Sequence, residues 1–313
     1  MNGRKVNRAF LISILLYTGC IFGLVYILPE LFSSIVINNL ICETSVVLPG
    51  ILFAVFSGER LPEFLHLKRL KPGTILAVIP FTMFSVPFIT LINLISQFFV
   101  ENTVAAMMEG YQVAEMPFWQ LWLSVGVFAP FCEEAACRGV FYRGYKKTGG
   151  AFKAMLLSSL LFALVHMNIN QAMYAFAMGI MAVLLVEASG SLWASMFYHG
   201  LINSSQVLLM YGMLKVNPGA YSEAAKAMDR DLMIYGLAGY LVITALTLPL
   251  AWAILVWISG NEGRRGVLRA VWKEKADISE NTKKKDKLVT VSLILALILC
   301  IAIIILTMLP VNS

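Results

Sequence analysis

Charged side chains are scarce in this sequence. Asp, Glu, Lys and Arg make up only 13% of its 313 residues, whereas 59% are hydrophobic. An average soluble domain carries about 25% charged residues, so a chain this apolar would not stay dissolved in water. The scarcity of charge argues against a soluble protein and predicts an all-α fold, a polytopic transmembrane helix bundle.

Cysteine pairs and several catalytic motifs are missing as well. The five cysteines are odd in number and form no Cys-x-x-Cys pair, which argues against a disulfide framework and a cysteine-based zinc site. The sequence contains neither His-Glu-x-x-His, the common zinc-protease motif, nor Gly-x-Ser-x-Gly, the nucleophile elbow of many hydrolases. The net charge of +6 arises from basic residues in loops between apolar runs, so we expect no nucleic-acid partner.

What the sequence does contain is a series of apolar runs, most of them long enough to cross a bilayer. We expect about eight or nine membrane helices, because two runs in the middle of the chain are short. The runs cover residues 9–28, 35–56, 74–100, 118–140, 151–165, 172–186, 191–211, 232–258 and 288–309. No separate soluble domain is evident, so residues 1–313 are predicted to form a single membrane domain.

The charges of the loops alternate along the chain. Basic loops lie at the N-terminus and after the second, fourth and eighth runs, whereas acidic or neutral loops follow the first, third and seventh. Because cytoplasmic loops carry an excess of Lys and Arg, we expect a cytoplasmic N-terminus and the lipid bilayer as the main surroundings. The compactness of the chain favours the plasma membrane of a bacterium.

Five polar side chains interrupt three of these runs. Glu133 and Glu134 are adjacent in the fourth run, His166 ends the fifth, and His199 and Asn203 lie one helical turn apart in the seventh. Polar and charged groups at membrane depth are costly and are usually functional. We therefore expect these side chains to face one another in one site.

Such a set of groups suits the hydrolysis of a peptide bond. A carboxylate can take the proton of a water that attacks a carbonyl, and an imidazole can orient that water or protonate the leaving amine. A His and Asn pair can donate hydrogen bonds to the developing oxyanion. The same groups could hold a divalent metal such as zinc, with Glu133, His166 and His199 as its ligands, and the residues leave both readings open.

Taken in chain order, the polar groups also resemble the motifs of a known family. These are the CPBP intramembrane proteases, also called the CAAX protease and bacteriocin-processing or Abi family, which includes Ras-converting type prenyl endopeptidases. The resemblance covers about residues 118–209, and leaves residues 9–100 and 232–309 as flanking helices. The motifs are Glu133-Glu134-x-x-x-Arg138, Phe162-x-x-x-His166 and His199-x-x-x-Asn203.

The resemblance implies a role for each residue. Glu133 would be the general base that activates water, and His166 would share that water. His199 and Asn203 would stabilise the oxyanion, while the second carboxylate and the arginine of the first motif would form a supporting ion pair. Whether a metal takes part is not implied either way.

The implied function is an intramembrane endopeptidase with glutamate-activated water. Its substrate would be a membrane-associated peptide or protein, either prenylated in the CAAX manner or a bacteriocin or pheromone. Two alternatives come from other classes: a proton-coupled membrane transporter, and a non-catalytic immunity or scaffold protein of the same fold. The first would be expected to show inverted repeats with interrupted helices, and no such pair of runs is evident.

Overall fold

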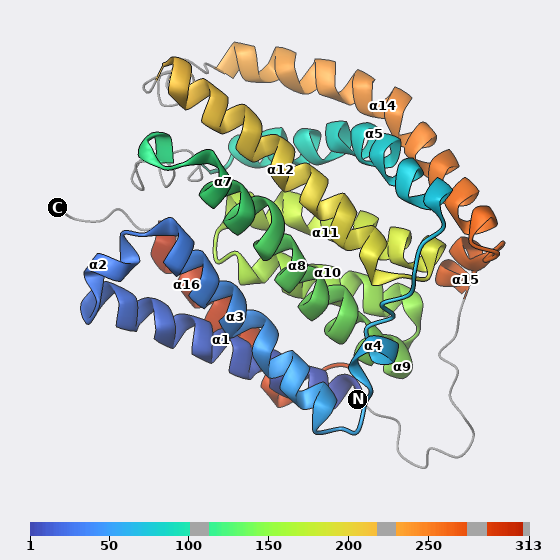
Figure 1. The fold of residues 1–313 in the computed structure, drawn as a ribbon, viewed down its shortest axis with the longest axis horizontal. Helices are drawn as coiled ribbons and strands as arrows, with labels where there is room; N and C mark the ends of the chain where they lie inside the picture. The colour runs from blue at the N-terminus through green and yellow to red at the C-terminus, as the bar shows by residue number, and fades with distance from the viewer. Residues whose placement is uncertain (101–112, 218–229, 274–286, 309–313) are drawn as a thin grey trace.

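The computed structural model describes residues 1–100, 113–217, 230–273 and 287–308, and this part of the chain is built of helices without a strand (Figure 1). The long helices are α1 (Gly3–Tyr26), α3 (Ile35–Val55), α5 (Pro72–Gln97), α10 (Ala151–Val165), α11 (Ile169–Ser189), α12 (Leu192–Val216), α14 (Arg230–Asn261) and α16 (Val291–Met308). Short helices connect them: α2 (Pro29–Phe32), α4 (Leu61–Phe64), η1 (Val113–Glu115), α9 (Arg143–Gly149) and α15 (Val267–Lys273). The all-α class predicted from the sequence is confirmed.

Helical segments coincide with all nine apolar runs of the sequence. Five helices, α1, α3, α5, α11 and α14, are long and apolar enough to cross a membrane by length and composition, and two shorter apolar helices, α10 and residues 291–307 of α16, accompany them. The number of spans, eight or nine, stays a prediction.

The fourth run is not one regular helix. It consists of α7 (Phe118–Leu121), η2 (Trp122–Phe128), α8 (Ala129–Glu134) and η3 (Ala135–Tyr142), which follow one another without a break. In η2 and η3 the backbone has π-type hydrogen bonding, which widens a helix and is frequent at functional sites. We call this continuous segment the central run.

The central run is enclosed by other helices. Its α8 part packs against α3 and α12, and η3 packs against α3 and α10. The helices α1, α3 and α16 form a group on one side of it, whereas α5, α11 and α14 form a group on the other (Figure 1). Most side chains of α8 therefore point into the interior of the protein.

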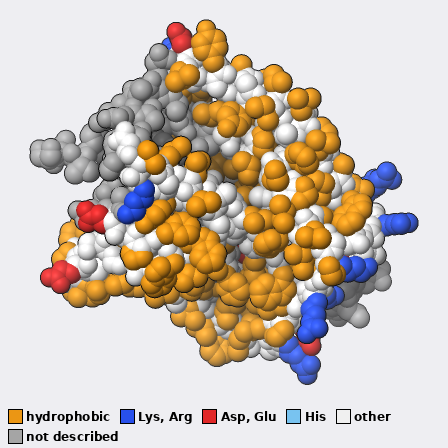
Figure 2. Space-filling model, turned by 45° about the horizontal axis from the view of Figure 1, so that its top comes forward, with side chains coloured by type: hydrophobic (Ala, Val, Ile, Leu, Met, Phe, Trp, Pro, Cys, Tyr) orange, Lys and Arg blue, Asp and Glu red, His pale blue; other side chains and the backbone are white. Residues whose placement is uncertain are grey.

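The outer surface is apolar over wide areas. Figure 2 shows hydrophobic side chains over most of the visible face, with Lys and Arg gathered toward one edge. Large apolar side chains of α14, such as Leu241, Val242 and Leu246, are well exposed. A water-soluble monomer rarely exposes so much contiguous apolar surface. With the five long apolar helices, this identifies an integral membrane protein.

Candidate active site

The two adjacent carboxylates lie at the end of α8 and have different surroundings. The side chains of Glu134 and Arg138 are both 0% exposed, and Arg138 Nη1 lies 2.9 Å from Glu134 Oε1. The Arg138 guanidinium also lies 4.2 Å from the ring centroid of Phe162. Glu133 has no arginine or lysine partner among the described residues. The charge of Glu134 is thus compensated, and that of Glu133 is not.

His199 connects the two carboxylates. Its Nδ1 lies 3.1 Å from Glu134 Oε1, and its Nε2 lies 3.3 Å from Glu133 Oε2. Because Glu134 is held by the arginine, it can in turn hold the imidazole ring in place, as a carboxylate does for many catalytic histidines. The ring is almost completely buried.

His166 approaches Glu133 from the end of α10. Its Nε2 lies 3.8 Å from Glu133 Oε1, and its Nδ1 lies 2.9 Å from the carbonyl oxygen of Phe162. A carbonyl oxygen can only accept a hydrogen bond, so Nδ1 carries a proton and Nε2 faces Glu133. The His166 side chain is 17% exposed and thus more open than His199.

Asn203 lies one helical turn after His199 on α12, and its amide has a backbone partner. Asn203 Nδ2 donates a hydrogen bond to the carbonyl oxygen of Val125 at 3.1 Å, and Ser204 Oγ lies 3.4 Å from that of Gly126. Pro130 explains why these carbonyls accept side-chain donors. It has no N–H, so neither an α-type bond to Gly126 nor a π-type bond to Val125 can form from it.

The structure therefore brings four of the five predicted polar groups into direct contact and places the fifth beside them. Pro130, Ser204 and the ring of Phe162 also contribute to the site, and none of the three was predicted to do so. That ring lies edge-on to His166 and His199, with centroids 5.0 and 5.7 Å away. Its position one turn before His166 in the sequence was the available signal.

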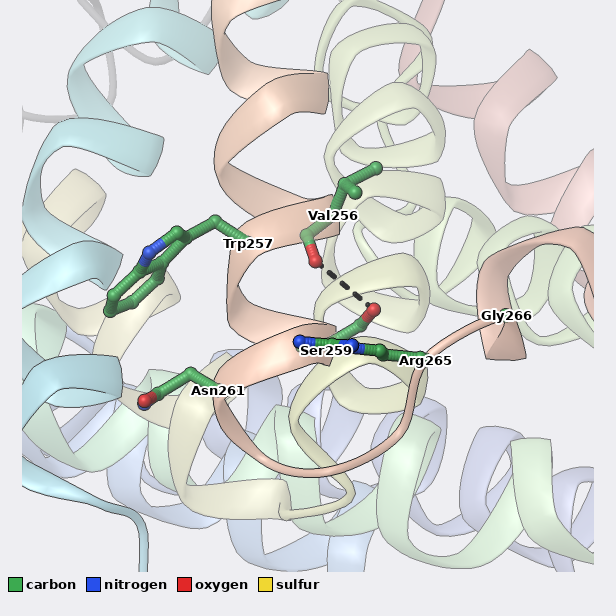
Figure 3. Close-up of a pocket in the computed structure, with 7 residues that line it drawn as sticks. Val256, Trp257, Ser259, Asn261, Arg265 and Gly266 are labelled. Carbon is green, nitrogen blue, oxygen red and sulfur yellow. Dashed lines mark hydrogen bonds between the residues drawn. The ribbon is translucent and has the colours of Figure 1, made fainter.

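Two clefts lie away from this cluster. One, of about 470 Å3, is at the end of α14, where Trp257, Asn261 and Arg265 line it (Figure 3). The other, of about 480 Å3, lies between α3 and η2 and reaches Phe128. Of these two clefts, the second borders the central run, which carries Glu133 and Glu134 further along.

The donor groups of the site can be compared with those that a metal ion requires. One carboxylate and two imidazole Nε2 atoms are donors that zinc accepts, and both imidazoles have the Nδ1 partners that zinc-bound histidines usually have. As arranged, however, Glu133 faces both imidazoles directly, and the described part of the chain contains no group of three His, Cys, Asp or Glu side chains placed to hold a metal ion. The residues as placed therefore do not fit a metal.

Comparison with known proteins gives one match. Residues 115–205 match the family model described as type II CAAX prenyl endopeptidase Rce1-like. The searches of curated proteins and of solved structures each found no match. The matched segment contains the central run, both histidines and Asn203. The resemblance predicted from the sequence is confirmed over residues 115–205, which are similar to CAAX-type prenyl endopeptidases.

Proposed function

We propose that this protein is an intramembrane endopeptidase in which Glu133 activates the attacking water. One observation carries the proposal: of two adjacent carboxylates, Glu134 is neutralised by Arg138, whereas Glu133 faces two imidazoles and remains available. A carboxylate with a free lone pair is what a general base requires. The CAAX-type family match over residues 115–205 supports the same class of reaction.

The reaction would proceed in two proton transfers. Glu133 takes a proton from a water, whose oxygen attacks the scissile carbonyl carbon, and His166 Nε2 orients that water. The tetrahedral intermediate then collapses, the C–N bond breaks, and the proton held by Glu133 passes to the leaving amine. The products are a new carboxyl group and a new amine, so atoms and charges balance.

The oxyanion of the tetrahedral intermediate needs hydrogen-bond donors. His199, held by Glu134, lies beside Glu133, and the amide of Asn203 has a second N–H besides the one bound to Val125. These two groups are our candidates for the oxyanion donors. Removal of one such donor from a protease lowers kcat by about 10²- to 10³-fold.

The substrate, the topology and the roles of the chain segments are proposed from the family match and the loop charges. We propose a membrane-associated peptide or protein substrate, prenylated at a cysteine as in a CAAX sequence, with bacteriocin or pheromone processing as the alternative. The basic loops support a cytoplasmic N-terminus, and the compact chain favours a bacterial plasma membrane. Residues 118–209 would form the catalytic part of a single membrane domain, and the flanking helices would contribute to substrate choice.

The proposal is tested with purified protein in liposomes and a farnesylated peptide that has three residues after the modified cysteine. In ¹⁸O-labelled water, we expect the labelled oxygen in the new carboxyl group of the product, detected by mass spectrometry. His166→Ala and His199→Ala should each lower kcat by about 10²-fold or more without loss of fold. A proton flux across the same liposomes without any peptide cleavage would favour the transporter instead.

The role of metal is measured on the same sample. Metal content and cleavage after treatment with a chelator are determined together. Cleavage that survives in metal-free protein supports water activation by Glu133 alone, whereas stoichiometric zinc and loss of activity on chelation would contradict it.

A further inference from the structure

A third carboxylate faces the cluster from a helix outside the matched segment. Helix α3 runs along the central run and contacts it at two points. At its start, Asn39 Nδ2 donates hydrogen bonds to the carbonyl and hydroxyl oxygens of Ser124, at 2.9 and 3.0 Å. Three turns later, a Cβ on Gly50 would lie 3.4 to 3.5 Å from Val140 and Phe141. Between these contacts, α3 lies against α8.

Glu43 lies on the contacting face of α3 between these two points. Residues 39, 43, 46 and 50 follow one another at intervals of three or four, so they share one side of the helix. The two contacts place Glu43 opposite the part of the central run that contains Cys132 and Glu133. Both residues interact electrostatically with Glu43, which agrees with that position.

One oxygen of the Glu43 carboxyl group lacks a hydrogen-bond partner among the described residues. This atom, Oε2, is buried, and no described residue donates a hydrogen bond to it. Two buried acids in the described part of the chain do have partners: Glu134 is paired with Arg138, and Glu187 accepts hydrogen bonds from Tyr142 and Lys146. A buried acceptor without a donor destabilises a protein and calls for an explanation.

The cleft between α3 and η2 lies close to this part of the two helices. Among its lining residues are Leu40 and Phe128, which lie about one turn before Glu43 and Glu133 on their helices. A substrate chain would have to extend beyond the cleft, along α3 and the central run, to approach both carboxylates.

A substrate bound near Glu43 and Glu133 would need hydrogen-bond acceptors for its backbone. To be cleaved, its backbone must be extended, so its N–H groups lose their helical partners. Inside a bilayer no bulk water replaces them, and each group must find a partner on the protein. We propose that Glu43 is a substrate-binding residue whose free oxygen accepts a hydrogen bond from a backbone N–H next to the scissile bond. This inference rests on the proposed function.

The test uses two substitutions with opposite expectations. Glu43→Leu removes the acceptor and should lower kcat/KM for the farnesylated peptide by about tenfold or more, mainly through KM. The same variant should unfold at a higher temperature, because a buried polar group without a partner is removed. Glu43→Gln keeps an acceptor oxygen at the same reach and should recover most of the loss.

A matched control lies on another helix. Thr244 on α14 also has a buried hydroxyl without a partner, and α14 packs against α5 and α11 rather than against α8. Thr244→Val should change neither kcat nor KM. A similar change in KM would show that the effect of Glu43→Leu is not local, and would overturn the inference.

Peptide binding separates this inference from the proposed function. Cleavage by the parent protein and its loss in Glu133→Ala test the function. The Kd of the peptide for Glu133→Ala, compared with Glu133→Ala/Glu43→Leu, tests Glu43, and we expect a rise of about tenfold. An unchanged Kd, a lower unfolding temperature in Glu43→Leu, or a Gln variant as weak as the Leu variant would each overturn the inference.

Discussion

At the scale of single residues, the site depends on the different surroundings of two neighbouring glutamates. Arg138 lies against Glu134 and over the ring of Phe162. Helix α11 approaches this arginine closely at Gly179, where a Cβ would lie 3.1 Å from Arg138 Nη2 and 2.8 Å from Ser159 Cβ. The absence of a side chain at Gly179 therefore leaves room for the guanidinium. The buried arginine thus compensates the charge of Glu134, and Glu134 in turn orients His199. Glu133 has no such ion pair among the described residues and can act as the base in the reaction.

This arrangement predicts a large effect of Arg138 on stability. Arg138→Met removes the arginine partner of the fully buried Glu134 and leaves it only the contact with His199. Loss of one partner from a buried ion pair costs about 3–5 kcal/mol. Thermal unfolding in detergent should show the loss. In the double variant Glu134→Gln/Arg138→Met part of it should return, and a strictly additive loss would contradict a direct ion pair.

At the scale of elements, the π-type segments and Pro130 shape the contact between the central run and α12. Pro130 frees the carbonyls of Val125 and Gly126, and side chains of α12 bind them. Trp122 Nε1 donates a further hydrogen bond to Ser204 Oγ at 3.0 Å. The position of Asn203 near the cluster is therefore a consequence of how these two elements pack.

A substitution at Gly126 tests the contact between η2 and α12. A Cβ at this position would lie 2.9 Å from both Ser204 Oγ and Trp122 Cδ1, so Gly126→Ala should push α12 from η2 and cost about 1–3 kcal/mol. A Cβ on Gly212, which lies on α12, would meet nothing within 4 Å, and Gly212→Ala should be neutral or slightly stabilising. Equal unfolding temperatures of the two variants would speak against a tight contact at Gly126.

These elements also show how far the sequence predicts the structure. The all-α class and the gathering of Glu133, His166 and His199 were predictable, because charged and polar groups stand out in apolar runs. The π-type hydrogen bonding and the partner of Asn203 were not, since they depend on which carbonyls Pro130 leaves free and on what α12 brings near them. Glu43 looked like an isolated polar residue in one run, and only packing of α3 on α8 relates it to the site.

At the scale of the whole molecule, loops at one end of the bundle are joined across long sequence distances. The carbonyl of His66 accepts a hydrogen bond from Leu192 N, and Ser191 Oγ donates one to the carbonyl of Lys68. Arg264 Nε donates to the carbonyl of Glu187 at 2.9 Å. These contacts connect the loop after α4 to the turn between α11 and α12, and the loop after α14 to the end of α11.

His66 makes this end of the bundle sensitive to pH. Burial, together with the positive charges of Arg143 and Lys68, lowers the pKa of His66 from 6.5 to about 4. The unfolded chain therefore binds a proton here below about pH 6.5, and the folded protein only below about pH 4, so stability should fall as pH decreases through this window. Asn tolerates the positive φ of 53° at this position, and His66→Asn should reduce the fall in unfolding temperature. An unchanged slope would rule out this origin.

The central claim is that Glu133 supplies the base, and the most direct measurement is single-turnover cleavage of the farnesylated peptide by Glu133→Gln in liposomes. Glutamine has nearly the same shape but cannot take the proton of water, so we predict peptide binding and an unfolding temperature close to those of the parent protein, with the rate reduced by about 10²-fold or more. Cleavage by Glu133→Gln at the parental rate would contradict the account.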